Sequence, residues 1–247
     1  MNIYPHDIVV PFKNSEESKK NQVGKMFDKI AYRYDFLNRF LSLGIDISWR
    51  KKALKYLIPV QPKQMLDVAT GTGDFAIMSY EILKPEKITG IDISDGMLDI
   101  GRKKIVSAGL ESKIELVHGD SEAMNFNDNS FDAVTVAFGV RNFENIEKGL
   151  SEILRVLKPG GKLVIVECTK PTLPVIKQLY FFYMKYITPK IGKIIAKNND
   201  AYKYLNNSIL QFPEKENFIH ILKQSAYRNA FYKTLTLGVC TIYCAEK

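Results

Sequence analysis

Hydrophobic and polar positions follow two alternating patterns along most of the chain. Short apolar runs bounded by polar residues are separated by longer segments in which apolar residues recur at helical spacing. The pattern predicts strands at 64–69, 87–92, 114–118, 131–138 and 162–168, and helices at 75–83, 96–107 and 146–157. Two further short strands are expected near the end, at 231–235 and 239–245. Because strands and helices alternate strictly, the sequence predicts an α/β fold, a parallel sheet with helices on both faces.

Three segments lie outside this alternation. Residues 1–22 include the polar run Asn14–Gln22 and predict a mobile tail. Between residues 23 and 58 apolar residues recur near helical spacing, with a break around Gly44, and predict a helical lead-in to the first strand. Residues 171–211 are first apolar and basic and then helical in pattern, which predicts a helical insertion. The length of 247 residues fits a single domain from 23 to 247.

A glycine turn follows the first predicted strand. Residues 65–75 read M-L-D-V-A-T-G-T-G-D-F. Gly71 and Gly73 lack a Cβ atom, so the backbone can turn sharply there and approach a ligand closely. About 20 residues later the second predicted strand ends in Asp92, where a carboxylate can accept hydrogen bonds from both hydroxyls of a ribose. This pairing predicts a site for a nucleotide-type cofactor.

The charges around the turn indicate which cofactor. Asp67 precedes the turn and Asp74 follows it. A dinucleotide would lay its pyrophosphate there, where two carboxylates would repel it. S-adenosylmethionine has no phosphate and carries a sulfonium cation and an ammonium group, which carboxylates attract. The turn therefore favours S-adenosylmethionine, held by Asp67, Gly71, Gly73 and Asp92. A nicotinamide-dependent oxidoreductase and a glycine turn without a ligand stay open as alternatives.

Composition and charge narrow the remaining classes. The three cysteines, Cys168, Cys240 and Cys244, lack zinc-like spacing and leave one over from any disulfide, which predicts a protein of the reducing cytoplasm. No metal site is predicted. The formal net charge of +8 fits nucleic acid, anionic lipid or neither. Nucleic acid is not expected as a partner, because the aromatic residues sit beside aliphatic ones and not along a basic stripe.

Several motifs together resemble the ubiquinone/menaquinone biosynthesis C-methyltransferase family, over nearly the whole chain after the tail. Residues 34–49, Y-D-F-L-N-R-F-L-S-L-G-I-D-I-S-W, are similar to that family's Y-D-x-M-N…S…H-x-x-W signature, with Asp46 in place of the histidine. Residues 155–169, R-V-L-K-P-G-G-K-L-V-I-V-E-C-T, resemble its R-V-L-K-P-G-G…E-x-S signature. The boxes F-G-V-R-N at 138–142 and Y-x-Y-L-x-x-S-I at 202–209 also look like the family.

The resemblance implies a fold and further cofactor contacts. The expected fold is the seven-stranded, Rossmann-like sheet of class I S-adenosylmethionine-dependent methyltransferases, with the last strand antiparallel. By the same resemblance Thr72 contacts the cofactor, Asp92 binds its ribose, and Asp120 with Ser121 holds its adenine. At Ala137 the family often has a serine that contacts the cofactor, and alanine cannot make that hydrogen bond.

The reaction implied by the resemblance is methylation of a carbon on a prenylated quinol ring, in menaquinone or ubiquinone biosynthesis. The ring carbon becomes nucleophilic when a ring hydroxyl ionises, but a free phenol titrates near pH ~10. Arg141 is the candidate that favours the phenolate by its charge, Asn142 the candidate hydrogen-bond partner of the ring oxygen, and Tyr34 with Asp35 candidates for orienting the ring or relaying a proton. Two alternatives remain open: a structural ion pair for Arg141, and another hydrophobic small molecule as substrate.

Residues 174–195 mix aromatic and aliphatic side chains with lysines. Such a segment fits an isoprenoid tail on its apolar side and anionic headgroups on its lysines, which predicts transient contact of a cytoplasmic protein with the inner face of the membrane. A helix packed against the sheet would show the same pattern. The sequence leaves open the type of quinol ring, the tail length and whether the chain forms a homodimer.

Overall fold

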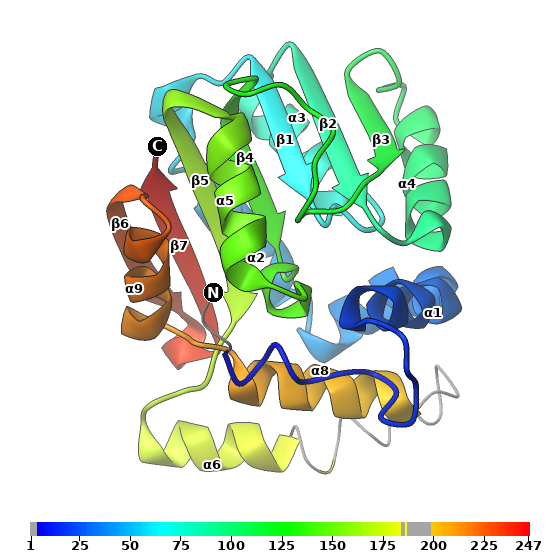
Figure 1. The fold of residues 1–247 in the computed structure, drawn as a ribbon. Helices are drawn as coiled ribbons and strands as arrows, with labels where there is room; N and C mark the ends of the chain where they lie inside the picture. Colours follow the sequence, from blue (N-terminus) through cyan, green and yellow to red (C-terminus); the bar gives the residue numbers. More distant parts are fainter. Residues whose placement is uncertain (1–3, 184–185, 187–198) are drawn as a thin grey trace.

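The computed structural model of the protein describes residues 4–183, 186 and 199–247 (Figure 1). Its centre is a seven-stranded sheet in the order β3-β2-β1-β4-β5-β7-β6. Neighbours from β3 to β5 pair in parallel, and β7 is antiparallel to both β5 and β6. The prediction of a seven-stranded sheet with an antiparallel last strand is confirmed. The strands are β1 Gln64–Val68, β2 Lys87–Asp92, β3 Ile114–His118, β4 Phe131–Ala137, β5 Leu157–Cys168, β6 Arg228–Leu235 and β7 Cys240–Glu246.

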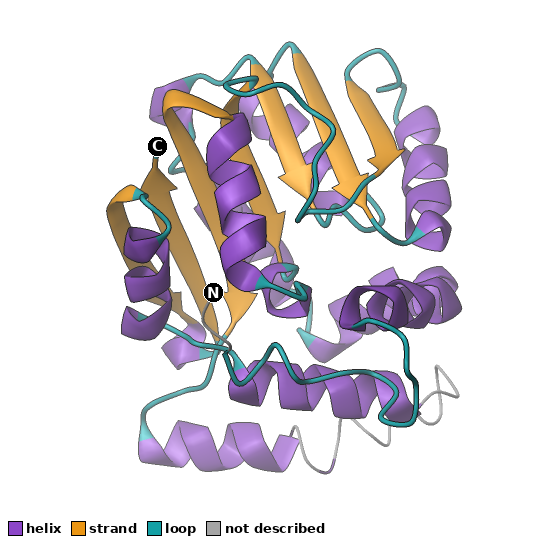
Figure 2. Cartoon of the chain, in the orientation of Figure 1, coloured by secondary structure: helices purple, strands orange, loops and turns teal. Residues whose placement is uncertain are grey.

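Helices cover both faces of this sheet, as the alternating pattern predicted (Figure 2). One core joins the sheet to α5 and α9 through residues such as Leu150, Ile153 and Phe218. The other joins it to α2, α3 and α4 through residues such as Leu54 and Phe75. The helices are α1 Lys19–Leu41, α2 Ile45–Leu54, α3 Asp74–Leu83, α4 Asp95–Ser107, α5 Ile146–Val156, α6 Pro174–Phe182, α8 Asn199–Gln211 and α9 Glu216–Gln224, with short 3₁₀ turns η1 Ile58–Val60, η2 Val140–Asn142 and η4 Thr236–Gly238.

The fifth strand begins earlier than its apolar run indicated. It starts at Leu157 and not at Lys162, and its pairing with β4 shifts register between Phe131 and Ala133. The shift accommodates the turn residues, where Gly160 has a φ of +76°. A glycine with a positive φ is typical of a β-bulge. The glycine turn is therefore part of strand β5, whereas the sequence predicted it just before the strand.

The amino-terminal segment is packed where its composition predicted a mobile tail. Helix α1 begins at Lys19, four residues before the expected boundary, and Ser18 caps it by accepting a hydrogen bond from the backbone N–H of Asn21. Lys19 is buried and donates to the carbonyl of His6 at 2.8 Å. The Tyr4 hydroxyl reaches Glu147 of α5 at 2.8 Å. Specific hydrogen bonds satisfy these polar groups, so they can be buried. The polar composition of the segment therefore did not reveal that it is packed.

Helices α1, α6 and α8 gather beyond the carboxyl ends of the parallel strands (Figure 1). Gly44, with a φ of +74°, separates α1 from α2. Helices α6 and α8 occupy the predicted insertion at 171–211, and its residues 184–185 and 187–198 lie outside the described residues. Within the described part of the chain, no helix is long and apolar enough to cross a membrane.

Candidate active site

Two cavities meet at the carboxyl edge of the sheet, where open α/β sheets bind ligands. The first, here called the polar cavity, has a volume of about 70 Å³ and is lined by Gly71, Asp92, Asp120 and Ser121 among others. The second, the apolar cavity, has a volume of about 320 Å³ and lies between α1, α2, α6 and α8. Both cavities are bordered by Phe27, Tyr34, Phe138 and Asn142. A ligand in one cavity therefore lies against a ligand in the other.

The two glycines of the turn have different surroundings. Both are left-handed, with φ of +56° at Gly71 and +74° at Gly73. A Cβ atom on Gly71 would stand 4.0 Å from the Tyr34 ring, across the polar cavity. A Cβ atom on Gly73 would instead lie 3.4 Å from Leu116 and 3.8 Å from the Gly101 backbone. Gly71 thus faces the predicted ligand, and Gly73 allows the turn to pack closely on β3 and α4.

Asp92 is held in place at the end of β2 and lines the polar cavity. One carboxylate oxygen accepts from the backbone N–H of Gly71 at 2.8 Å, and the other accepts from that of Ser94 at 2.9 Å. Burial raises the pKa of Asp92, and these backbone hydrogen bonds oppose that rise. An ionised carboxylate has about four acceptor positions, so these bonds leave acceptor capacity for a ribose hydroxyl.

Asp67 lies beneath the turn and not on the cavity surface. Its oxygens accept from the Thr70 hydroxyl at 2.7 Å and from the Thr135 hydroxyl at 2.6 Å. Burial raises the pKa of Asp67 to about 6, and the two hydroxyl bonds only partly oppose it. Asp67 therefore ties β1 to β4 and places a carboxyl group that titrates close to neutral pH under the predicted cofactor.

The Thr72 side chain points away from both cavities. Its hydroxyl bonds Asp35 at 2.6 Å and the Lys104 ammonium at 3.0 Å. Lys104 also pairs with Asp35 at 2.5 Å and with Asp74 at 2.6 Å. This cluster joins α1, α3 and α4 behind the turn. Because its side chain is engaged in this cluster, Thr72 could contact a cofactor only through its backbone. Asp35 belongs to the same cluster and lines neither cavity.

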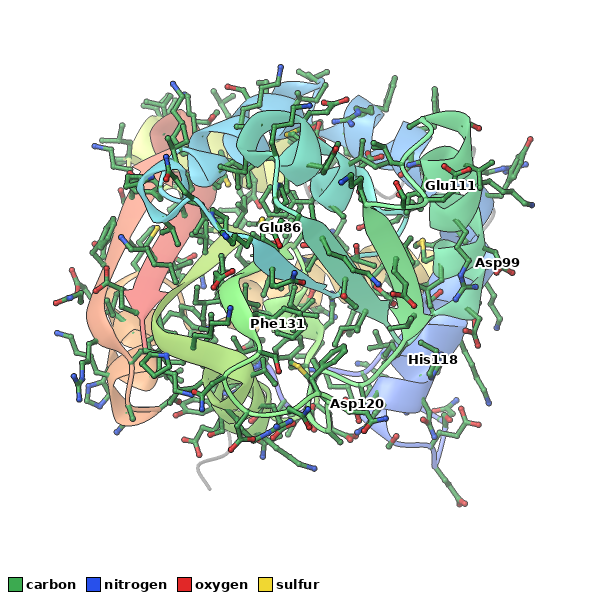
Figure 3. The ribbon with its side chains drawn as sticks, turned by 90° about the horizontal axis from the view of Figure 1, so that it is seen from above. Glu86, Asp99, Glu111, His118, Asp120 and Phe131 are labelled. Carbon is green, nitrogen blue, oxygen red and sulfur yellow. The ribbon has the colours of Figure 1, made fainter. Side chains whose placement is uncertain are left out.

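Asp120 and Ser121, which the resemblance implies hold the adenine, follow β3 and line the polar cavity. One Asp120 oxygen accepts from the backbone N–H of Glu122 at 2.9 Å, and the other pairs with Lys20 of α1 at 2.5 Å. Sequence reasoning missed Lys20, because it falls in the run predicted as tail. His118, two residues earlier, is exposed (Figure 3). Its ring lies 3.1 Å from Asp95, and it lines neither cavity.

Arg141 and Asn142 sit on η2, directly after β4, and both line the apolar cavity. An Arg141 Nη1 group donates to Glu167 at 2.7 Å and to the Phe138 carbonyl at 2.5 Å. Glu167 is fully buried near the end of β5. Arg141 therefore forms the structural ion pair that was the alternative to a catalytic role, and the partner of Arg141 lies on β5, next to β4. Burial alone would lower the pKa of Arg141, but the Glu167 charge raises it, so the guanidinium stays ionised.

The ion pair does not use all the polar atoms of η2. The Nε atom of Arg141 and the Oδ1 atom of Asn142 are buried and have no hydrogen-bond partner among the described residues. Buried polar atoms of this kind are uncommon in folded proteins. Two residues that line the apolar cavity thus carry a donor and an acceptor without a partner, which a polar group of a ligand could supply.

Tyr34 of α1 stands at the boundary of the two cavities. Its hydroxyl hydrogen-bonds Asn38, one turn further along the helix. Burial raises the pKa of Tyr34, so the hydroxyl stays protonated at neutral pH. The predicted catalytic residues Tyr34, Arg141 and Asn142 are thus brought together at one wall by α1 and η2.

Asp46, which replaces the family's histidine, is buried among arginines. It pairs with Arg39 at 2.5 Å and with Arg50 at 3.0 Å, and it accepts from the Ser42 hydroxyl at 2.8 Å. A carboxylate so surrounded by cations is compensated in its buried position. Position 46 therefore supports the wall formed by α1 and α2.

The comparisons with known proteins agree with this geometry. The ubiE/COQ5 methyltransferase family matches residues 15–247. The chain is 48% identical over 244 residues to a demethylmenaquinone methyltransferase of Bacteroides fragilis, with 99% of each chain covered. It is 42% identical over 237 residues to the ubiquinone/menaquinone biosynthesis C-methyltransferase UbiE of Geotalea daltonii, covering 96% of this chain and 100% of that protein. A solved SAM-dependent methyltransferase of Thermotoga maritima has a TM-score of 0.63 at 19% identity, over 90% of this chain and 99% of the other.

The solved structure is too distant in sequence to show more than the fold, and it confirms the predicted methyltransferase fold. The family match confirms the predicted dependence on S-adenosylmethionine. With the glycine turn and Asp92 in the expected places and the match extending to residue 247, this chain belongs to the ubiE/COQ5 methyltransferase family.

Proposed function

We propose that this protein methylates a ring carbon of a prenylated quinol. Its relatives are named as a demethylmenaquinone methyltransferase and a ubiquinone/menaquinone biosynthesis C-methyltransferase, which supports the proposal. The observation that carries the proposal is the common wall of the two cavities, with the glycine turn and Asp92 on one side and an apolar space on the other. When bound, S-adenosylmethionine supplies an electrophilic methyl group: the bond to the ring carbon forms as the S–CH₃ bond breaks, S-adenosylhomocysteine leaves, and the proton displaced from that carbon passes to solvent. The Gly71 position and the carboxylates of Asp67 and Asp92 fit this cationic donor.

Arg141 and Asn142 activate the ring in this proposal. The guanidinium stabilises negative charge on a ring hydroxyl through its unpaired Nε atom, which lowers the pKa of that hydroxyl. Asn142 and Tyr34 orient the ring at the boundary of the cavities, so that the ring carbon faces the methyl group. Glu167 holds Arg141 in place on the other side.

The test is to incubate the protein with S-adenosylmethionine and either reduced demethylmenaquinone or its benzoquinol counterpart, and to analyse the products by mass spectrometry and NMR. We expect one added methyl group on a ring carbon. A methyl group on oxygen would contradict carbon methylation. Cofactor binding without methylation of either quinol would favour another hydrophobic small molecule as substrate.

The affinity for S-adenosylmethionine is expected to fall as the pH drops below about 6. Burial raises the pKa of Asp67 from its usual value near 4 to about 6, so lowering the pH through this window neutralises the carboxylate that lies beneath the turn, close to the proposed cationic donor. Binding of the cation favours the ionised form, so it releases a proton in this window and its affinity levels off above it. Each unit by which the donor lowers this pKa changes the affinity about tenfold.

Calorimetry between about pH 4.5 and 8 on the wild type and on Asp67→Asn measures this effect. The variant carries no titratable group at that position, so its affinity should be lower than that of the wild type at neutral pH and should lack this pH dependence. The same slope in both proteins would show that another group, such as Asp92, is responsible. The raised pKa also means that, without a ligand, Asp67 lowers the stability of the fold as the pH rises from about 4 to 6.

We also propose that α6 rests on an anionic bilayer, which holds the isoprenoid substrate. Val175, Leu179 and Phe182 form a solvent-exposed stripe along one side of α6, while Tyr180 and Tyr183 line the apolar cavity. A helix simply packed on the sheet would bury its apolar stripe, and α6 has no buried residue. This supports contact of the stripe with lipid.

The end of α1 extends this surface around the mouth of the apolar cavity. The Tyr183 hydroxyl donates to the Leu41 carbonyl at 3.1 Å, which places the end of α1 beside the end of α6. Phe36, Phe40 and Leu43 are exposed there. The apolar cavity, lined in part by Leu41 and Leu43, therefore lies next to apolar surface on both sides, as a ligand drawn from a bilayer requires.

Val175→Glu is expected to weaken binding to anionic vesicles several-fold, because it places a charge in the stripe that meets the bilayer. Val106→Glu on α4 is a matched control, since Val106 is 60% exposed and Val175 is 67% exposed. Flotation with phosphatidylglycerol vesicles compares the two. Val175→Glu should also slow methylation of a long-tailed quinol and spare a short-tailed, water-soluble one. Equal vesicle binding by both variants would exclude the stripe as the lipid contact.

A further inference from the structure

A tyrosine that lines the apolar cavity has a hydroxyl without a partner among the described residues. Tyr204 of α8 is 3% exposed and lines this cavity. Its hydroxyl oxygen is buried and has no hydrogen-bond partner among the residues that the structure describes. Buried hydroxyls in folded proteins are nearly always hydrogen-bonded. One turn further along α8, the buried Ser208 hydroxyl donates to the Leu205 carbonyl at 2.9 Å, so the helix satisfies that hydroxyl but not this one.

The fold brings Tyr204 close to η2. Ala201, Tyr204, Leu205 and Ile209 recur at helical spacing and present one face of α8 to the cavity. Helix α8 packs against η2, which carries Arg141 and Asn142. Tyr204 and Arg141 line the same cavity. The cavity thus has polar groups on the η2 wall and one hydroxyl on the α8 wall.

The Tyr204 hydroxyl is a hydrogen-bond donor at neutral pH. Burial raises its pKa above the usual value, and although the Arg141 charge opposes this rise, it does not overcome it. A quinol ring carries two oxygens, on opposite sides of the ring. The η2 wall can bind one of these oxygens through Arg141 and Asn142, which leaves the second oxygen in need of a partner inside an otherwise apolar space.

We propose that the Tyr204 hydroxyl donates a hydrogen bond to the ring oxygen opposite the one that Arg141 binds, and so selects a ring with two oxygens. This inference rests on the proposed methylation of a quinol. Two anchors on opposite sides fix the ring within its own plane, so that the carbon beside the Arg141-bound oxygen faces the polar cavity. A ring with a single hydroxyl would have the η2 anchor alone and would leave Tyr204 unpaired.

The test compares Tyr204→Phe with the wild type on two rings, a short-tailed 2-alkyl-1,4-naphthohydroquinone and the 3-alkyl-1-naphthol, which keeps the hydroxyl beside the methylated carbon and lacks the second oxygen. We expect the variant to lower kcat/KM on the hydroquinone about tenfold or more and to leave kcat/KM on the naphthol near the wild-type value. The dissociation constant of each ring, measured without the methyl donor, should change in the same way. The affinity for S-adenosylmethionine should not change.

Tyr227→Phe is a matched control. Tyr227 is also 3% exposed, but its hydroxyl donates to the Leu150 carbonyl at 2.9 Å in the core. This variant should lose stability and treat the two rings alike. An equal loss on both rings with Tyr204→Phe would assign Tyr204 to packing, and no loss on either would remove it from the site; both results overturn the inference alone. A wild type that methylates neither ring but binds S-adenosylmethionine would overturn the proposed function and this inference with it.

Discussion

The double variant Arg141→Met, Glu167→Gln is expected to slow methyl transfer by about 10²–10³ with little change in the affinity for S-adenosylmethionine. The rate falls because the variant lacks the cation that stabilises the phenolate. The fold should persist, because both charges of the buried pair are removed together and neither is left without a partner. Single-turnover kinetics at saturating S-adenosylmethionine measure the rate, and calorimetry measures the affinity.

The single variants separate catalysis from stability. Arg141→Met alone leaves the Glu167 carboxylate buried and unpaired, so its stability should fall by about 3–5 kcal/mol. Glu167→Gln alone keeps the guanidinium and should retain most of the rate. Raising the pH should partly rescue the double variant, since the ring hydroxyl then ionises without help from the protein. A near-normal rate of the double variant at neutral pH would return Arg141 to a purely structural role.

Gly71→Val is expected to reduce the affinity for S-adenosylmethionine by at least about 100-fold, because the valine side chain would occupy the position of close backbone approach. The Cβ atom would project toward Tyr34 across the polar cavity. The substitution also imposes a left-handed φ of +56° on a β-branched residue, which costs stability of about 1–2 kcal/mol. Calorimetry and thermal unfolding measure the two effects separately.

Two other glycines serve as controls for this variant. Gly109 has a φ of +65°, and a Cβ atom added there would meet no atom of the described residues within 4 Å, so Gly109→Val should lose stability and keep full affinity. Gly73→Val should lose more stability, because its side chain would meet Leu116 and the Gly101 backbone. Unchanged affinity in Gly71→Val, or the same loss of affinity in Gly109→Val, would disprove the assignment of the turn.

The sequence predicted the sheet well because each strand and helix carries its own local pattern. Period-two and helical spacings report which side of an element is buried, and the alternation then dictates parallel pairing. The antiparallel direction of β7 came from the family resemblance, since no local pattern encodes it. The start of α1 at Lys19 was missed, because its buried polar side chains are satisfied by distant partners such as His6.

Only part of the site could be predicted from the sequence. Gly71 and Asp92 could be placed because strand ends lie at known positions in such a sheet. The pairing of Arg141 with Glu167 joins η2 to β5, and spacing along the chain does not reveal it. The unpaired hydroxyl of Tyr204 was equally hidden, because the lack of a partner depends on everything packed around α8.

Helix α1 forms part of the wall of both cavities through Phe27 and Tyr34, and this has a thermodynamic consequence. Lys20, near the start of the same helix, also closes on Asp120 beside the polar cavity. If a ligand in one cavity fixes the position of α1, it also fixes the part of the other cavity that α1 forms, and so helps the second ligand to bind. The two affinities are then linked by a single coupling free energy, and each ligand must strengthen the other by the same factor.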